Sequence, residues 1–149
     1  MRTIRRQQSM EPGSSPGFLL WRVTLRWQRL MTATLRPFSL THVQFVLLAS
    51  LWWLSEMRHE APSQRRLAEF AGTDKMMTSQ VLRALEARGL IDRADDPEDS
   101  RARRLAVTAR GAELGQAAII AVEAADRSFF TPAGDPERVL EILRALTVV

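Results

Sequence analysis

Residues 63–108 read SQRRLAEFAGTDKMMTSQVLRALEARGLIDRADDPEDSRARRLAVT. The periodicity of this stretch predicts two helices, over 63–71 and 74–88, separated by a turn at Gly72. A charged, turn-rich stretch over 93–104 follows, and then a short strand of alternating apolar residues. Two helices joined by a turn and followed by a hairpin with an arginine-rich tip are typical of a winged helix-turn-helix. Such a module places one helix in the major groove of DNA and can lay its β-ribbon against the minor groove.

Local signals mark the ends of both predicted helices. Ser63 can cap the first helix, and either Thr73 or Asp74 can cap the second. Gly89 suits the position after a helix end, where the backbone often turns left-handed. In the second helix, four residues recur at helical spacing and are expected to face the core: Thr78, Val81, Leu82 and Leu85.

The remaining face of the second helix points outward and is predicted to bind DNA. Its hydroxyl, amide and cationic side chains can bond to base edges and to phosphates. Gln80 and Ser79 are candidates to read bases, whereas Arg83 is a candidate phosphate contact. The full predicted set is Ser63, Gln64, Lys75, Met76, Met77, Ser79, Gln80, Arg83, Asp99, Arg101, Arg103 and Arg104.

Several members of this set have a second interpretation. The two methionines either touch bases or lie at the edge of the core, and the two residues that start the first helix either contact phosphate or only cap the helix. Arg103 and Arg104 either touch phosphate or are solvated charges. We expect Arg101 both to pair with Asp99 and to enter the minor groove, because a narrow, electronegative groove floor attracts arginine.

The chain resembles the MarR-type (multiple antibiotic resistance regulator) transcription factors over roughly residues 18–146. In the wing signature of that family, an Asp-x-Arg precedes alternating apolar residues and a Leu-Thr-x-x-Gly, and here Val107 stands in place of the leucine. The residues that carry the resemblance are Asp74-Lys75, Leu85-Glu86-Ala87-Arg88-Gly89-Leu90-Ile91, Asp99-Ser100-Arg101, Leu105, Val107-Thr108 and Gly111.

The expected fold is mainly α with a small β-wing, in a single domain over 18–146. The winged helix-turn-helix occupies 40–108. Amphipathic helices over 18–36 and 109–146 flank it, and the last of them carries an apolar stripe of Val139, Leu140, Leu143 and Leu146. The resemblance implies that these N- and C-terminal helices interdigitate with those of a second subunit. The homodimer would then present two recognition helices to a pseudo-palindromic operator in double-stranded DNA.

The overall charge does not locate the DNA-binding surface. Net charge is +4, and residues 60–110 hold ten basic and nine acidic side chains. Residues 1–36 hold seven arginines against one acid, Glu11, and residues 1–17 read as a flexible basic tail. The positions of particular arginines therefore carry more information than the total.

No targeting or membrane-spanning segment is predicted. The most apolar run, 43–54, is about 12 residues long, and a span needs about 20. The run reads as a buried core helix, capped by Thr41 and Gln44. We expect a cytoplasmic protein of a bacterium or archaeon, associated with the nucleoid when it is bound to DNA.

The sequence shows no catalytic or metal-binding constellation, and neither an enzyme nor a cofactor is predicted. The chain has no cysteine, which excludes a disulfide framework and a thiol redox sensor. His42 and His59 have no ligand partners at metal spacing. Four clustered carboxylates lack the glycine and distal glutamate of a calcium loop, and we interpret them as a solvated hairpin tip: Asp95, Asp96, Glu98 and Asp99.

A small-molecule site can be named only from the resemblance. In the family, aromatic or phenolic compounds often bind between the dimerisation helices and the winged helix. Trp21, Arg22, His42, Trp52 and Trp53 could line such a site here. Core packing explains the tryptophans equally well. We expect all four tryptophans of the chain to be core residues: Trp21, Trp27, Trp52 and Trp53.

These observations predict a sequence-specific DNA-binding transcriptional regulator, a repressor that a small aromatic ligand releases from DNA. The alternative is a winged helix that mediates protein contacts without specific DNA binding, which the nearly neutral charge of residues 60–110 permits.

Overall fold

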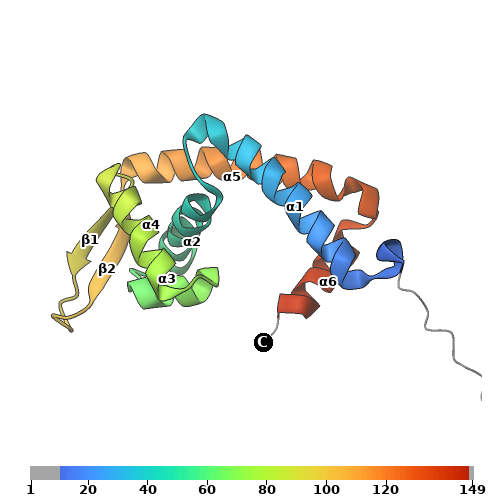
Figure 1. Ribbon diagram of the computed structural model, residues 1–149. Coiled ribbons are helices and arrows are strands. Elements are labelled where there is room, and N and C mark those ends of the chain that lie inside the picture. Colours follow the sequence, from blue (N-terminus) through green and yellow to red (C-terminus); the bar gives the residue numbers. More distant parts are fainter. Residues whose placement is uncertain (1–10, 148–149) are drawn as a thin grey trace, which may run out of the picture.

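The protein is described over residues 11–147 by a computed structural model. Its elements follow one another in the order η1 (Pro12–Ser14), α1 (Pro16–Leu35), η2 (Arg36–Phe38), α2 (His42–Arg58), α3 (Gln64–Ala71), α4 (Lys75–Ala87), β1 (Ile91–Asp95), β2 (Arg103–Val107), α5 (Ala109–Phe130), η3 (Thr131–Ala133) and α6 (Pro136–Thr147). The long helix α5 forms the top of an arch (Figure 1). The winged helix-turn-helix lies under one end, and α6 with the first half of α1 lies under the other.

Side-chain caps set the starts of the main helices. Thr41 and Gln44 form the predicted capping box at α2, with each side chain bonded to the backbone amide of the other. Ser63 caps α3 by accepting from the amide of Arg66 at 3.1 Å. Of the two candidates for α4, the N-cap is Asp74, which accepts from the amide of Met77 at 2.8 Å.

Helix α2 is the centre of the core. Its leucines at 47, 48, 51 and 54 are fully buried, and the helix contacts α1, α3, α4, α5 and β2. Each buried leucine contributes about 1.5–3 kcal/mol of transfer free energy. The predicted core face of α4 is confirmed, because Thr78, Leu82 and Leu85 are buried and Val81 is partly buried against them.

The wing is a two-stranded antiparallel hairpin in which Ile91 pairs with Val107 and Asp95 pairs with Arg103. The strands extend further into the charged stretch than the sequence predicts, so that only residues 96–102 remain as the loop. The segment before α3 lies along the outer edge of β2, where the amide of Leu105 donates to the carbonyl of Pro62 at 2.9 Å. This bond joins the wing to the helix-turn-helix.

The terminal helices leave much of their apolar surface uncovered within one chain. In α1 the apolar residues Met31 and Leu35 are buried, but Leu20 and Val23 are exposed. Helix α6 has no buried residue, and Leu140, Leu143 and Leu146 are all exposed. The predicted apolar faces therefore exist, but the part of this chain that the structure describes does not cover them.

The prediction that all four tryptophans are core residues is wrong for the single chain. Trp21 is 60% exposed and Trp53 is 36% exposed. Trp27 and Trp52 are only partly buried. Helical spacing identifies an apolar face, but it does not say how much of that face the rest of the chain covers.

Two further predictions concern the N-terminal tail and the absence of a membrane-spanning helix. Of the predicted tail, residues 1–10 lie outside the described residues, and residues 12–17 form η1 and the first turn of α1. Among the described helices, none is long and apolar enough by itself to cross a membrane. The bent pair Pro16–Phe38 and His42–Arg58 passes that test of length and composition only when the two are taken together.

Candidate DNA-binding surface

Helix α4 presents a polar and methionine-rich face to solvent. Lys75, Met76, Met77, Gln80 and Arg83 are exposed, and Met76 has the largest exposed fraction among the described methionines and aromatic residues, at 72%. Ser79, which is also in the predicted set, is only partly exposed. The hydroxyl of Thr78 donates to the carbonyl of Asp74 at 2.7 Å, which satisfies the one buried polar side chain of the helix.

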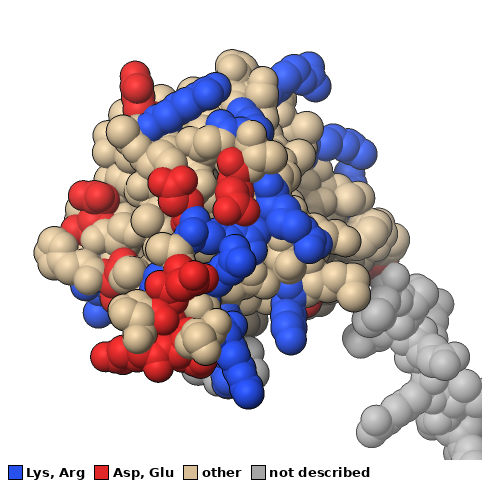
Figure 2. Space-filling model, turned by 90° about the vertical axis from the view of Figure 1, so that its left-hand side faces the viewer, with Lys and Arg blue, Asp and Glu red and all other residues tan. Residues whose placement is uncertain are grey.

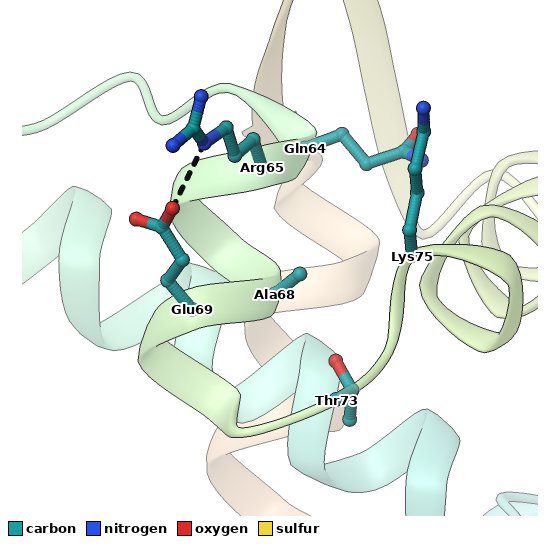
Figure 3. A pocket seen from close by; sticks show the side chains of 6 residues that line it. All are labelled: Gln64, Arg65, Ala68, Glu69, Thr73 and Lys75. Atoms are coloured by element: carbon teal, nitrogen blue, oxygen red, sulfur yellow. Dashed lines mark hydrogen bonds and ion pairs between the residues drawn. The ribbon is translucent and has the colours of Figure 1, made fainter.

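A cleft of about 450 Å³ lies between α3 and α4 (Figure 3). The side chain of Gln64 extends from α3 toward that of Lys75, at the start of α4. The residues that line the cleft are Gln64, Arg65, Ala68, Glu69, Thr73 and Lys75. The cleft thus joins predicted DNA-binding residues of both helices with Arg65 and Glu69, which the sequence analysis did not include.

Arg93 on β1 is a mostly buried cation that contacts both α3 and α4. Its Nε lies 3.2 Å from a carboxylate oxygen of Glu86 on α4, and its side chain is only 12% exposed. Its Nη1 donates to the side-chain oxygen of Gln64 on α3 at 3.5 Å. Arg93 therefore connects the wing to both helices of the helix-turn-helix. Sequence reasoning missed it because its strand lies in a stretch that reads as turn.

At the tip of the wing, Asp99 supports Arg101 through the backbone. A carboxylate oxygen of Asp99 accepts from the backbone amide of Arg101 at 2.9 Å. The guanidinium of Arg101 takes part in no ion pair with the described residues and is exposed. Arg103, also exposed, lies 3.9 Å from a carboxylate oxygen of Asp95.

The interpretation of the acidic cluster as a solvated tip is wrong for Asp96. Asp96 is 8% exposed, and one of its oxygens lies 2.7 Å from Nε of Arg104. The other oxygen accepts from the amide of Glu98 at 2.9 Å. The amide of Glu98, more than the charge of Arg104, holds the pKa of Asp96 below its usual value, against the opposing effect of burial.

Arg104 is correspondingly a structural residue of the wing base. Besides binding Asp96, its guanidinium donates from Nη1 to the carbonyl of Ala61 at 2.9 Å. Arg104 also forms a β-bridge with Ser63, the N-cap of α3. Two of its donors are thus used inside the protein, whereas Arg101 keeps its guanidinium free.

The five residues named for a small-molecule site do not gather in one place. Trp21 and Arg22 are exposed on α1, and Trp53 stacks on Phe70 of α3 with ring centroids 5.4 Å apart. His42 packs edge-on against Trp27, whose Nε1 donates to Asp126 at 2.7 Å. Neither the α3–α4 cleft nor a shallow cleft along α1 includes any of the five.

Two polar groups on α2 are nevertheless chemically unusual. Nε1 of Trp52 is buried without a hydrogen-bond partner among the described residues. Burial lowers the pKa of His42, and the nearby carboxylate of Asp126 only partly opposes this. A buried donor without a partner is costly and suggests that another group satisfies it in the functional state.

The charge of the wing and α4 face is mixed. Acidic side chains lie among the basic ones over this face (Figure 2). Four arginines on this face or next to it lie within ion-pair distance of a carboxylate. The pairs are Arg66–Glu60, Arg93–Glu86, Arg103–Asp95 and Arg104–Asp96. The surface therefore lacks the strong positive field of many DNA-binding proteins, and its few free cations carry more weight.

Comparison with known proteins agrees with this geometry. The profile of the MarR family matches residues 40–102. The HTH-type transcriptional regulator YdcH of Bacillus subtilis is 44% identical over 136 residues, which cover 91% of each chain. The HTH-type transcriptional repressor Rv2887 of Mycobacterium tuberculosis is 33% identical, over 74% of this chain and 76% of its own.

Among solved structures, CouR from Rhodococcus jostii, bound to p-coumaroyl-CoA, is 28% identical with a TM-score of 0.77. The match covers 93% of this chain and 92% of CouR. The curated relatives are transcriptional regulators, which confirms that the chain is a regulator and not an enzyme. The extent of identity to YdcH and the matching wing and helices lead to one conclusion: this chain belongs to the MarR family of DNA-binding, winged helix-turn-helix transcriptional regulators.

Proposed function

We propose that this protein is a sequence-specific repressor that binds a pseudo-palindromic operator as a homodimer and leaves it when a small aromatic ligand binds. The observation that carries the first part is the outward face of α4, where Gln80 can read a base edge between the phosphate-binding candidates Lys75 and Arg83. Arg101, free of ion pairs at the tip of the wing, extends the same surface toward the minor groove. The repressor Rv2887, 33% identical, supports the direction of regulation.

The homodimer is supported by the uncovered apolar faces of the terminal helices. A helix of about 12 residues is marginal alone in water, and α6 buries none of its side chains against the rest of residues 11–147. A second copy of α1, α5 and α6 offers a matching apolar surface. Two subunits related by a two-fold axis then place two α4 helices on successive turns of DNA.

Release by a ligand is supported by two polar groups on α2. Nε1 of Trp52, which has no hydrogen-bond partner among the described residues, and the partly buried His42 both offer polar contacts to a ligand. An aromatic compound with one or two acceptor groups suits such a setting. CouR, 28% identical, binds p-coumaroyl-CoA, which is an aromatic acyl thioester. We propose that the protein acts in the cytoplasm, where such compounds and the chromosome meet.

An electrophoretic mobility shift with the DNA upstream of its own gene tests the DNA-binding part of this proposal. We expect a dimer-sized complex that survives excess random DNA and weakens steeply between about 50 and 200 mM salt. The chain has four tryptophans and no tyrosine, so its fluorescence reports on tryptophan alone. A panel of aromatic carboxylic acids and their CoA thioesters should contain a compound that quenches this fluorescence and dissociates the complex. Binding that is equally tight on all DNA would instead favour a protein-interaction role.

A further inference from the structure

One of the two cations that line the cleft between α3 and α4 is held in an ion pair. Arg65 lines the cleft, yet its Nε lies 2.9 Å from a carboxylate oxygen of Glu69, one helical turn further along α3. The guanidinium of Arg65 points toward Glu69, on the side of α3 away from Lys75 and Gln64 (Figure 3). The lining of the cleft therefore includes one ammonium, one amide and the ion pair between Arg65 and Glu69.

The ion pair that engages Arg65 is weak. The side chain of Arg65 is 89% exposed and that of Glu69 is 57% exposed. An exposed pair at this helical spacing contributes little to helix stability, because water screens both charges. A doubly hydrogen-bonding phosphate is a stronger partner for a guanidinium than a solvated carboxylate on the same helix. The guanidinium is thus poised to change partner.

We propose that the α3–α4 cleft binds one backbone phosphate of DNA through Gln64, Arg65 and Lys75, and that Glu69 restrains this binding by competing for Arg65. The inference rests on the proposed DNA binding. It adds Arg65 as a hydrogen-bond donor to phosphate, and Glu69 as the residue that competes for Arg65. Because a phosphate carries no sequence information, Glu69 limits affinity for DNA of every sequence to the same extent.

The mixed charge of the surface explains why a single glutamate matters here. Four arginines on or beside this face are already paired with carboxylates. Few cations are left to bind phosphate, so freeing Arg65 adds a large share to the electrostatic attraction. Because the restraint acts equally on operator and non-specific DNA, it lowers affinity and leaves the specificity ratio unchanged.

The test is the salt dependence of binding to a short duplex of random sequence, measured by fluorescence anisotropy with Glu69→Gln. We expect an affinity about threefold to fivefold higher, which corresponds to losing one nearby negative charge in a watery setting. The slope of log affinity against log salt should steepen by about 0.9 for each winged helix bound. The upstream DNA of its own gene should show the same fold-change.

Glu123→Gln is the matched control, because it removes the same charge from an exposed position on α5, a helix that contributes no residue to the cleft. It should leave affinity and slope unchanged. Arg65→Gln should lower affinity on both DNAs, and in that background Glu69→Gln should have little effect. Arg65 and Glu69 are both exposed, so neither substitution should disturb the core. Thermal melting followed by circular dichroism checks that each variant folds.

Two outcomes would overturn the inference while leaving DNA binding intact. Glu69→Gln behaving like Glu123→Gln would show that Glu69 exerts no restraint. If Glu69→Gln raised DNA affinity as much in the Arg65→Gln background as in the wild type, the glutamate would act through long-range electrostatic repulsion of DNA and not through Arg65. A wild-type protein that binds neither DNA would overturn the proposed function itself, and this inference with it.

Discussion

Asp96 and Arg104 form an ion pair across the base of the wing loop, with 2.7 Å between a carboxylate oxygen and Nε. The same guanidinium donates to the carbonyl of Ala61, in the segment that leads into α3. Asp96 also holds the loop by accepting from the amide of Glu98. One connected set of bonds thus fixes the wing loop, the second strand and the start of the helix-turn-helix relative to one another.

The first prediction concerns this pair. Asp96→Asn should weaken DNA binding on the order of tenfold, because a charge-assisted bond that positions the wing is lost. Anisotropy with the upstream DNA measures the effect. Asp95→Asn is the control, since Asp95 is exposed and lies 3.9 Å from Arg103. Equal affinities of the two variants would show that the pair does not position the wing.

The same pair gives a pH dependence with a definite sign. The pKa of Asp96 is lower in the folded protein than its usual value, so its contribution to stability is complete above that usual value. The contribution is lost as the pH falls through the lower, folded value. The difference in melting temperature between wild type and Asp96→Asn should therefore be constant near neutrality and shrink below about pH 4. A difference that grew on acidification would contradict the sign.

The second prediction concerns the tip of the wing. Arg101→Ala should weaken DNA binding by about 1–3 kcal/mol with the fold and the dimer preserved, as expected for the loss of a charged groove contact. Asp99→Ala should cause part of the same loss, because the carboxylate of Asp99 holds the backbone of Arg101. Unchanged affinity of Arg101→Ala, with an unchanged circular dichroism spectrum, would exclude the minor-groove role.

The third prediction separates base reading from phosphate binding on α4. Gln80→Ala should change the sequence recovered in a binding-site selection, because the side-chain amide of Gln80 can form two hydrogen bonds with the edge of one base. Arg83→Ala should recover the parent sequence but weaken binding to all DNA and lower the salt slope by about 1. If Gln80→Ala selected the parent site and Arg83→Ala a different one, the two roles would be reversed.

The fourth prediction concerns Gly111, at the start of α5. A Cβ on Gly111 would lie 1.9 Å from the carbonyl oxygen of Leu90, which is backbone and cannot move aside. Gly111→Ala should therefore destabilise the protein by about 1–3 kcal/mol, the usual cost of overpacking. Gly115→Ala, on the same helix, would meet only Leu48 at 3.6 Å and should be neutral or stabilising by up to about 1 kcal/mol. Denaturant unfolding of both variants decides the matter.

The fifth prediction concerns assembly. Deleting residues 135–149 should give monomers or aggregate and abolish tight operator binding, because a single winged helix loses its second half-site. Burying the four stripe residues of α6 is worth about 1.5–3 kcal/mol each before entropy costs, and no other described part of the chain buries them. Analytical ultracentrifugation of the truncated protein tests this. A folded dimer with full operator affinity would remove α6 from the interface.

The sequence by itself determined the helices of the winged helix-turn-helix and which way α4 faces. The N-caps at Ser63 and Asp74 and the left-handed Gly89 act on residues one turn away, so they can be read without knowing the fold. The spacing of the buried residues of α4 is likewise a local property, and it assigned the outward face correctly.

Only the tertiary structure decided the electrostatic roles. Arg93 reaches Gln64 across 29 positions of sequence, and Arg104 reaches Ala61 across 43. Asp96 and Arg104 look like two solvent-exposed charges in the sequence, yet they form the ion pair that holds the base of the wing, and Asp96 is buried. The physical reason is range: caps and periodicity act within a turn of helix, whereas the burial and pairing of a charge depend on which distant segments the chain folds against it.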